Sequence, residues 1–420
     1  MPAIRDPVHS WIKCSENEQK IIDSPLFQRL HWVSQLNSVK QVFPGGVHTR
    51  FLHSLGVMKL AGQYLTHLLE GNDVPVPSVL KAYYIQLARL AGLLHDIGHG
   101  PFSHAFDCAI YEQLYNVRDG GHDFHRLTMV KSAFLRPLIE GCGIDVNHLI
   151  AVWNSNTEEY KTTSGATRFM FDIIRSTVQG PLGADRMDFT LRDSYFTGTS
   201  HLGTIASSRI ITNSSIRKVG DQVYLHYHFK CLSDIIQALS GRYYMYDSVY
   251  LHKTSGAANV LIEEMLLKSA KHLNIIERTK NLEEFQWLND STIIGEIMAY
   301  QGDEQEMLEA KEACKRLLRR QLPKLRAEIM VHKDTNFNPE PYLEEYSASL
   351  KISKEQLAVK RTRSIHGIDP EKFDQHHLRF WHPDDEISIT CKKALEKIRY
   401  TEPREPYYLV RVYSFDILRM

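Results

Sequence analysis

The stretch Leu93–His104, which reads LLHDIGHGPFSH, places three histidines and an aspartate at the end of an apolar segment. The apolar residues before it predict a helix that is buried on most sides, with Ser78 as its N-cap. We expect this helix to carry His95 and Asp96 at its C-terminal end, with His99 one turn further on. Nearby glycines and a proline then break the helix. Burying imidazoles and a carboxylate together is costly unless they bind something, so the stretch predicts a ligand site.

The His-Asp dipeptide alone says little about function. With 21 histidines in the chain, about one such pair is expected by chance. A second pair stands at His122 and Asp123. The prediction of a site at His95 and Asp96 therefore depends on their position at a helix end and on further ligands elsewhere in the chain.

The composition is that of a globular protein with a sizeable core. The chain has 420 residues, and its 50 basic and 50 acidic side chains cancel. This balance argues against a polycationic surface for duplex nucleic acid or an anionic membrane. No apolar run approaches the roughly 18 residues that suggest a membrane span. The six cysteines are scattered without a CxxC pair, and the first residues lack the features of a signal peptide, so we expect a reduced, cytoplasmic protein.

Apolar periodicity predicts a mainly α chain. We expect helices at residues 51–69, 166–195 and 232–250. Between the last two, residues 209–228 combine β-branched and aromatic side chains around the turn VGDQ, which is typical of a β-hairpin. A small β element therefore interrupts the helices.

The character of the chain changes after about residue 290. Residues 303–329 form a strongly charged helical pattern, and residues 406–418 read as a strand. We therefore predict a large N-terminal domain at residues 1–290 and a C-terminal α+β lobe at residues 291–420.

Two further residues could complete a metal site with His95 and Asp96. His53 lies near the start of the helix predicted over 51–69, and Asp185 lies in the segment GADRMDF. Two imidazoles and two carboxylates form a mixed nitrogen and oxygen set, which suits Mn, Fe, Zn or Ni better than a thiolate-loving ion. A satisfied histidine at a helix start and a capping aspartate would give the same pattern, so spacing alone leaves both interpretations open.

Asp185 begins a helical pattern that places several functional groups on one face. Phe189 and Asp193 follow at i+4 and i+8, so a candidate ligand, an aromatic ring and a second carboxylate share that face. Arg186 adds a cation beside the candidate ligand. An ordinary charged helix with one core ring fits the same spacing.

A later helical segment combines cations and tyrosines. Arg242, Tyr246, Tyr250 and Lys253 fall on one face of it. Arginine offers a bidentate fork for phosphate and lysine a point charge, while the tyrosines could lie against a sugar or a base. A solvated cationic edge beside an aromatic core is the alternative interpretation.

Taken in order, five segments of the sequence resemble the signature of HD-domain phosphohydrolases. They are HTRFLHSLGV, LLHDIGHGPFSH, DFHRLT, ADRMDFTLRDSYFTG and RYYMYDSVYLHK. The resemblance is closest to the deoxynucleoside triphosphate triphosphohydrolases, and it runs from RDPVHSWI near the N-terminus to about Lys253. It implies a helical HD-domain core for the N-terminal domain.

The resemblance implies roles for residues around a metal and a scissile phosphate. The implied metal ligands are His53, His95, Asp96 and Asp185. The residues implied around the phosphate are His99, His104 and His125, with Asp107 orienting His104 and Arg50 holding a phosphate oxygen. In this comparison His122 and Asp123 are incidental beside His125.

The resemblance also implies contacts with the sugar and the outer phosphates. Gln35 and Leu36 match the family's sugar-contacting pair. Tyr250 matches the aromatic residue that crowds the ribose 2′ position, and Asp193 matches the acceptor of the 3′-hydroxyl. The residues that would meet the β and γ phosphates are Arg186, Arg242 and Lys253, with His252 completing that wall.

The sequence departs from the family pattern in the substrate site and in a regulatory site. Phe189 stands where the family usually has tyrosine, so the ring is kept and the hydroxyl is lost. Arg186 stands where lysine is common, and the charge is kept. A regulatory guanine site in the family uses an Asp, a Gln and an Arg. Here the segment DSPLFQRLH keeps Asp23 and Gln28 but has His31 at the arginine position, so we expect no guanine-specific activation of that type.

Together these features favour hydrolysis of a deoxynucleoside triphosphate to the deoxynucleoside and inorganic triphosphate. The expected cofactor is a divalent transition metal (Mn, Fe, Zn or Ni), or Mg together with the substrate phosphates. The resemblance also implies a homo-oligomer, a dimer or a tetramer, and leaves a nucleotide effector open.

Two other functions remain as alternatives. One is a phosphodiesterase or nuclease acting on single-stranded or cyclic nucleotides, although the neutral net charge argues against an extended groove for a polymer. The other is a nucleotide-binding sensor with a vestigial site, against which the complete ligand set argues.

Overall fold

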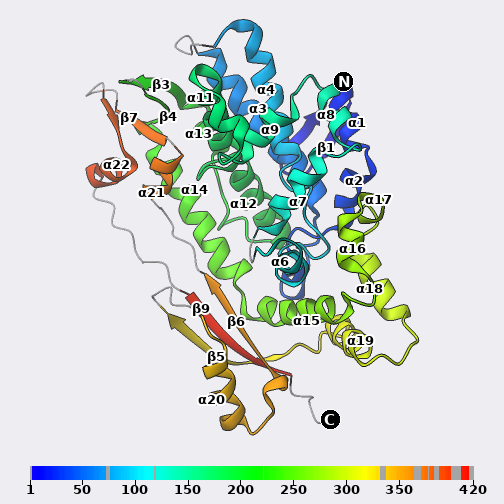
Figure 1. Cartoon of the computed structure of the whole chain (residues 1–420). Coiled ribbons are helices and arrows are strands. Elements are labelled where there is room, and N and C mark those ends of the chain that lie inside the picture. The colour runs from blue at the N-terminus through cyan, green and yellow to red at the C-terminus, as the bar shows by residue number, and fades with distance from the viewer. Residues whose placement is uncertain are drawn as a thin grey trace.

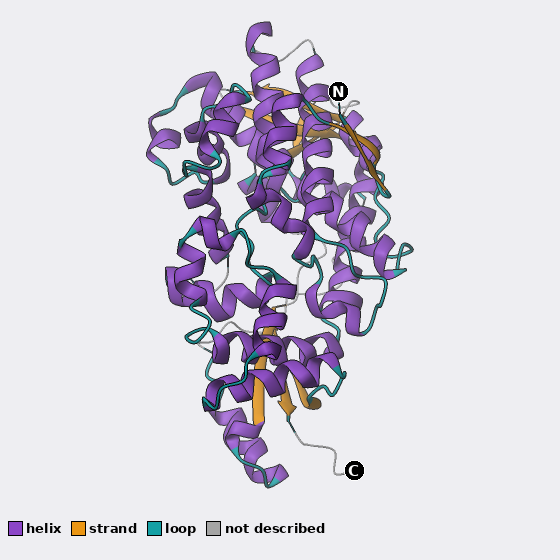
Figure 2. Ribbon diagram, turned by 90° about the vertical axis from the view of Figure 1, so that its right-hand side faces the viewer, coloured by secondary structure: helices purple, strands orange, loops and turns teal. Residues whose placement is uncertain are grey.

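Helices form most of the molecule. The computed structural model describes residues 2–71, 76–117, 120–220, 222–331, 337–363, 370–376, 378–382, 387–398 and 408–415. Within these residues the strands are confined to small sheets at the margins of a helical body (Figure 1, Figure 2). The predicted mainly α fold class is confirmed.

Two long helices form the centre of the fold. Helix α3 (Arg50–Glu70) and helix α4 (Ser78–Leu93) pack along each other, and most of the residues that they bury are apolar. The helix predicted over 51–69 is therefore confirmed. The predicted N-cap is wrong by one residue, because Pro77 occupies the cap position and Ser78 is already helical.

Shorter segments surround this pair. Before α3 lie α1 (Glu16–Ile22), α2 (Pro25–Gln28), and the turns η1 (Arg29–Trp32) and η2 (Asn37–Gln41). After α4 come α5 (His104–Phe106), the π-helical turn η3 (Asp107–Tyr111), α6 (Glu112–Tyr115), α7 (Gly121–Val130), α8 (Arg136–Gly141), α9 (Val146–Trp153) and α10 (Glu158–Thr162).

The helix predicted over 166–195 is two helices in the structure. They are α11 (Gly165–Gln179) and α12 (Ala184–Thr197). The break falls at Gly180 and Pro181, where the proline ring and its missing N–H cannot continue a helix. The break lets α12 start afresh, so Asp185 lies in its first turn.

A hairpin follows α12, as predicted. Helix α13 (Ser207–Thr212) leads into β3 (Ser214–Val219), which pairs antiparallel with β4 (Gln222–His228). Strand β7 (Leu378–His382) then pairs parallel with β4, and β8 (Ile387–Ile389) pairs with β7. A second hairpin near the N-terminus, β1 (Ala3–Asp6) with β2 (Ser10–Lys13), was not predicted.

The chain continues from this sheet through further helices. They are the turn η4 (Phe229–Cys231), α14 (Leu232–Met245), the π-helical turn η5 (Tyr246–Tyr250), α15 (Lys253–Ser269), α16 (Ile275–Lys280), α17 (Leu282–Phe285), α18 (Asp290–Ala299) and α19 (Gln305–Leu318). The helix predicted over 303–329 is too long. It ends at Leu318, and after Pro323 the chain forms strand β5 (Lys324–Val331).

A three-stranded sheet forms the lower end of the molecule in Figure 1. Its central strand is β9 (Tyr408–Ser414), flanked by β5 and by β6 (Leu357–Arg363). The strand predicted near the C-terminus is β9. Helix α20 (Glu340–Leu350) and the turn η6 (Lys354–Gln356) accompany this sheet, whereas α21 (Pro370–Gln375) and α22 (Cys391–Lys397) lie beside β7 of the other sheet.

One hydrophobic core extends over most of the chain. Its buried members run from Ile12 near the N-terminus to Leu395 near the C-terminus. Helix α19 packs along α15, and β7 returns to the sheet of β4. The division into lobes at residue 290 stays a prediction. In the described part of the chain we find no helix with the length and apolar character that crossing a bilayer requires.

Candidate functional site

The HD dipeptide lies in a turn and not at the end of a helix. Helix α4 ends at Leu93, and the Leu94 N–H closes it by donating to Leu90 O. His95 and Asp96 follow in the turn, with side chains that are 6% and 8% exposed. The His95 ring donates from Nδ1 to Gly92 O over 2.7 Å. This hydrogen bond fixes the tautomer, so the Nε2 lone pair is left to face the interior of the site.

His53 is held in the same way from the neighbouring helix. It lies in the first turn of α3, and its Nδ1 donates to Asp188 Oδ2 over 2.7 Å. Its Nε2 then lies 3.1 Å from His95 Nε2 and 3.2 Å from Asp185 Oδ1. Asp96 closes the group, since its Oδ1 is 3.3 Å from His95 Nε2 and its Oδ2 is 3.7 Å from His53 Nε2. We refer to His53, His95, Asp96 and Asp185 as the HD group.

The chemistry of the HD group fits a divalent cation. Both Nδ1 atoms donate elsewhere, so in the neutral rings both Nε2 atoms are acceptors that face each other and two carboxylates. Burial lowers the pKa of His53, but Asp185 and Asp188 outweigh it and raise the pKa to about 10, so the carboxylates favour a positive charge here, which a divalent cation would supply in place of the Nε2 proton. Burial likewise opposes ionisation of Asp185, while His53 and His95 hold the pKa of its carboxyl well below the usual range. A centre of mixed N and O donors suits Mn, Fe, Zn or Ni.

A buried charge network supports His53 from behind, and sequence reasoning missed it. Asp188 accepts from His53, from His9 Nε2 over 2.5 Å, and from Arg192 Nε over 2.9 Å. Arg192 in turn donates to Asp6 Oδ2 over 2.7 Å, and none of the Arg192, Asp188 and Asp6 side chains is exposed. The segment RDPVH and the spacing DRMDFTLRD were the available signals, but the pairing joins residues far apart in the sequence.

A glycine makes this network sterically feasible. Gly56 lies on α3 one turn after His53, opposite the Asp188 carboxylate. A Cβ at Gly56 would lie 1.9 Å from Asp188 Oδ1 and 2.5 Å from Arg192 Nη2. Any larger side chain would therefore displace the Asp188 carboxylate and the Arg192 guanidinium from their present hydrogen bonds.

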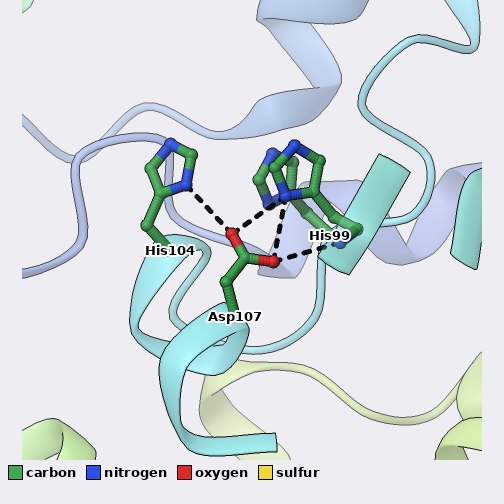
Figure 3. A group of neighbouring side chains, drawn as sticks. His99, His104 and Asp107 are labelled. Carbon is green, nitrogen blue, oxygen red and sulfur yellow. Dashed lines mark hydrogen bonds and ion pairs between the residues drawn. The ribbon is translucent and has the colours of Figure 1, made fainter. Parts of the chain in front are cut away.

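A second group of the same residue types lies next to the HD group. Asp107 Oδ2 accepts from His104 Nδ1 over 3.0 Å, and both Asp107 oxygens lie 2.9 Å from His122 Nδ1. The His99 ring stacks on His122 with 3.7 Å between ring centroids. Figure 3 shows His104 and His99 on either side of the Asp107 carboxylate. We refer to His99, His104, Asp107 and His122 as the Asp107 group.

The Asp107 group is arranged as a set of hydrogen-bond donors around one acceptor. Burial acts against the charge on Asp107, but the hydrogen bonds from His104 and His122 hold its pKa well below the usual range. Because both Nδ1 atoms donate to the carboxylate, they are occupied, and the Nε2 atoms are the free ring positions. His104 has a side chain that is 75% exposed, so its free nitrogen is accessible from the cavity.

Strained backbone positions His104 after the break. Phe102 and Ser103 have φ angles of 60° and 53°, the left-handed region that side chains rarely adopt. The strain is held by hydrogen bonds: Asp290 Oδ1 accepts from Phe102 N over 2.7 Å, and Ser103 Oγ accepts from Arg50 Nε over 2.7 Å. Arg50 also pairs with Asp96, so it ties the HD group to the start of the Asp107 group.

The structure places His122 and not His125 in the site. His125 is buried behind the cavity, where its Nδ1 bonds the Tyr115 hydroxyl over 2.8 Å and its ring meets Phe285 edge to face. His122 lines the cavity instead. The two histidines are three residues apart on α7, so sequence spacing could not choose between them. Gly98 decides the geometry, because a Cβ there would lie 2.1 Å from His122 O and would push α7 away.

Both groups open into one cavity of about 600 Å³. Most of the substrate residues expected from sequence line it: Gln35, Leu36, Arg50, Arg186, Phe189, Asp193, Arg242 and Tyr250. Tyr246, which the sequence placed on the face of Arg242 and Tyr250, lines it too, and lining residues to which sequence reasoning assigned no role include Asn37, His122, Gln179 and Asn259. Helix α12 contributes Asp185, Arg186, Phe189 and Asp193, so the shared face predicted for these residues is present.

Two arginines of the cavity, Arg186 and Arg242, form no ion pair with the described residues. Arg242 is half-buried, and it donates from Nη1 to Pro181 O over 3.3 Å. Burial and the neighbouring Arg186 lower the pKa of Arg242 to about 10. Arg186 Nη1 is also buried and has no hydrogen-bond partner among the described residues. Two guanidinium groups held together in this way favour an anion between them.

The opposite wall carries a clamped carboxylate. Asp193 Oδ2 accepts from the Tyr250 hydroxyl over 2.6 Å, and Asp193 Oδ1 lies 2.8 Å from His48 Nε2. Gln35 Oε1 is buried without a partner among the described residues, so it is free to accept from a ligand. Phe189 approaches Tyr250 edge to face, with 6.2 Å between ring centroids.

Two residues expected in the cation wall do not line the cavity. The Lys253 side chain is exposed at the start of α15, and its backbone O accepts from the Tyr413 hydroxyl over 3.1 Å. His252 is the N-cap of α15, and its Nδ1 accepts from Thr254 N over 3.2 Å. Arg242 and Lys253 therefore do not share a helix face as predicted. The π-helical turn at Tyr246–Tyr250 rotates the chain before α15 begins.

A helical body with a His-Asp pair in a turn, completed by a histidine and an aspartate from two other helices, defines an HD-domain metal-dependent phosphohydrolase. The HD domain family matches residues 50–166. The chain belongs to the HD-domain family that includes the deoxynucleoside triphosphate triphosphohydrolases.

Curated relatives cover the chain to different extents. The chain is 25% identical over 452 residues to the deoxynucleoside triphosphate triphosphohydrolase SAMHD1 of Gallus gallus, an alignment that covers 100% of this chain and 72% of that protein. It is 31% identical over 285 residues to an uncharacterized protein of Methanocaldococcus jannaschii, covering 68% of this chain and 53% of that protein. It is 27% identical over 390 residues to the uncharacterized protein YwfO of Bacillus subtilis, an alignment that covers 88% of this chain and 77% of that protein.

Proposed function

We propose that the chain hydrolyses deoxynucleoside triphosphates to the deoxynucleoside and inorganic triphosphate. The observation that carries this proposal is the order of groups around one cavity. The residues that line it are the HD group, the three histidines of the Asp107 group, Arg186, Arg242, Asp193 and Tyr250. A nucleotide offers matching chemistry in one molecule, since its phosphates suit the metal and the arginines and its sugar hydroxyl suits the carboxylate.

The proposed metal ligands are His53, His95, Asp96 and Asp185. A divalent ion bound there would polarise a phosphoryl oxygen and lower the pKa of water towards neutrality. The support is the convergence of two Nε2 atoms and two carboxylates in a setting that favours positive charge. Arg50 sits beside Asp96 and keeps one guanidinium edge near the same phosphate position.

The Asp107 group is proposed to supply the proton. Attack of water on the α-phosphorus breaks the bond to the 5′-oxygen of the sugar, and that oxygen must be protonated as it leaves. Asp107 holds His104 by Nδ1, so Nε2 of the imidazolium can donate to the 5′-oxygen. His122, held by the same carboxylate, and His99, stacked on it, complete the wall around the phosphate.

The outer phosphates and the sugar are proposed to occupy the rest of the cavity. Arg186 and Arg242 would meet the β and γ phosphates, which supply the anion that their arrangement lacks. Phe189 keeps the aromatic surface there without a hydroxyl to donate. Asp193 would accept from the 3′-hydroxyl, and Tyr250 would crowd the 2′ position, with Gln35 and Leu36 on the other side of the sugar.

The test is a product assay. Purified protein is incubated with Mn²⁺ and each dNTP, with and without a second nucleotide as activator, and the products are separated. Release of the deoxynucleoside and intact triphosphate is expected. Release of pyrophosphate or of single phosphate would reject the proposal. Cleavage of a labelled oligonucleotide, abolished by His95→Ala, would favour the phosphodiesterase or nuclease instead.

Assembly and regulation are further parts of the proposal. We propose a homo-oligomer, with residues 291–420 as a lobe that serves assembly or regulation. No guanine-specific activation is expected, because His31 replaces the family arginine. The His31 ring is stacked on Phe51 at 3.5 Å between centroids, which leaves it no fork for a guanine edge.

A further inference from the structure

Asp193 is held by two hydrogen bonds, one from His48, which does not line the cavity, and one from Tyr250, which does. His48 Nε2 lies 2.8 Å from Asp193 Oδ1, and the Tyr250 hydroxyl lies 2.6 Å from Asp193 Oδ2. The His48 side chain is fully buried and that of Asp193 is 2% exposed. An ionised carboxylate only accepts, so both neighbours donate, and each carboxylate oxygen keeps lone-pair capacity for one more donor. Asp193 lines the cavity, so the remaining capacity is available to a ligand there.

The His48 ring is fixed by its surroundings. Its segment pairs with the segment before it: Gln35 N donates to His48 O over 3.1 Å, and Arg50 N donates to Val33 O over 3.1 Å. The ring itself stacks on Phe196 of α12 with 4.5 Å between centroids and 20° between planes. His48 is thus tied to the backbone of Gln35 and to the helix that carries Asp193, and it cannot turn without disturbing one of them.

A structural role does not explain a histidine at this position. His48 Nδ1 is buried and has no hydrogen-bond partner among the described residues. A buried polar atom without a partner costs free energy that an apolar ring of the same size would avoid. The hydrogen bond from Nε2 to Asp193 is what the histidine provides in return, and it acts on a residue of the cavity.

We propose that His48 is a positioning residue that locks the Asp193 carboxylate as the acceptor for the 3′-hydroxyl of the nucleotide. This inference rests on the proposed function. With both donors in place the carboxylate cannot rotate, and it presents fixed acceptors to the cavity. A sugar without a 3′-hydroxyl leaves a buried, charged acceptor unpaired, so the site discriminates against it. His48 thereby sets selectivity for a free 3′-hydroxyl, although it does not touch the nucleotide.

The experiment compares dATP with 2′,3′-dideoxy-ATP, which differ in the 3′-hydroxyl alone. The variants are His48→Phe, which keeps the stack on Phe196 and removes the donor, and His48→Gln, which keeps an N–H donor at the end of the side chain. His48→Leu is the second donor-free variant, in case the added phenyl ring prevents folding. Turnover gives KM and kcat for each nucleotide, and calorimetry in the presence of a chelator gives the two dissociation constants without turnover.

For the wild-type protein, kcat/KM is expected to be about 10- to 100-fold higher for dATP than for the dideoxy nucleotide. This is the size of effect that loss of one hydrogen bond to a charged group produces. His48→Phe should reduce this ratio to within about threefold, chiefly by raising the KM for dATP, while values for the dideoxy nucleotide stay unchanged. His48→Gln should retain most of the ratio.

Three results would overturn the proposal. The first is an equal loss of kcat/KM for both nucleotides in His48→Phe, the second is a wild-type kcat/KM that is the same for both nucleotides, and the third is a His48→Gln variant that behaves like His48→Phe. Failure of the proposed function is distinguishable. In that case the wild-type protein releases no triphosphate, while the calorimetric preference for dATP and its dependence on His48 persist.

Discussion

The HD group and the Asp107 group consist of the same two residue types and lie side by side, yet their ring nitrogens are used in opposite ways. In the HD group, Nδ1 of His95 and of His53 donates to acceptors outside the group, and the Nε2 atoms converge. In the Asp107 group, Nδ1 of His104 and of His122 donates to the carboxylate inside the group. The place of the acceptor therefore separates the two groups: the HD group keeps its own carboxylates available for a cation, whereas the Asp107 carboxylate is occupied by two imidazoles.

The largest expected effect is on the HD group. His95→Ala removes one of the two converging nitrogens, so the cation and its electrostatic contribution of several kcal/mol are lost. Turnover should fall by about four orders of magnitude, and metal content measured by mass spectrometry should fall with it. His67→Ala is the matched control, because His67 lies near the other end of α3 and bonds Ser214 O. A His95→Ala protein that keeps its metal would contradict the assignment of the HD group.

A smaller effect is expected in the Asp107 group. Asp107→Asn keeps the size of the side chain but leaves a single acceptor for two histidines, so His104 and His122 are no longer both oriented. Turnover should fall by about two to three orders of magnitude, the range for general acid catalysis. Metal content should stay at the wild-type level. If metal and turnover fall together, the two groups are one functional unit and the comparison fails.

The support behind His53 is the next test. Asp188→Asn weakens the acceptor for His53 Nδ1, and loss of such an outer partner costs about 10- to 100-fold in metal affinity. Asp188 also pairs with buried Arg192, so the variant is destabilised for a second reason. Asp6→Asn separates the two effects, because Asp6 bonds Arg192 and has no contact with His53 in the structure.

Competition titrations with a chelator give the metal affinity, and urea unfolding gives the stability of each variant. Asp6→Asn should lower stability while metal affinity stays within about threefold of wild type. Equal loss of metal affinity in both variants would mean that the network acts through folding alone.

The sequence predicted the helical class because periodicity depends on short patterns. Periodicity located α3 and α4, but it extended α4 past Leu93 and so placed His95 and Asp96 in the helix instead of in the turn after it. The strands that the sequence did not predict depend on contacts between distant residues or are very short. Strand β7 pairs with β4, although about 150 residues separate them in the sequence. Strands β1 and β2 have four residues each, which is too short for a periodic signal.

The same distinction holds inside the site. His122 and His125 are equivalent in spacing, and the choice between them depends on how closely α7 approaches Gly98. Asp188 and Arg192 look like an ordinary i, i+4 pair on α12, and only the fold brings His9 and Asp6 to them. Lys253 was assigned by continuing a helical face through a segment that is π-helical. Local spacing cannot carry such information.

The smallest expected effect is on the pH dependence of stability, and it concerns His125, which lies outside the Asp107 group. Burial and nearby Arg29 lower the pKa of His125 to about 3, whereas an unfolded histidine titrates near 6.5. Between these values the unfolded chain binds the proton and the folded chain does not. The contribution of the neutral ring to stability is therefore fully present above pH 6.5 or so. It is lost as the pH falls, by about 1.4 kcal/mol per pH unit at most.

His125→Phe removes this proton uptake, so its free energy of unfolding should fall less steeply than that of the wild type between about pH 6.5 and about pH 4.5. Urea unfolding across this range measures the two slopes. His201→Phe changes an exposed histidine in the same way and should keep the wild-type slope, because that ring is in solvent before and after unfolding. Parallel slopes for wild type and His125→Phe would mean that His125 can take up a proton in the folded protein. It would then be open to the cavity, and the choice of His122 over His125 would be wrong.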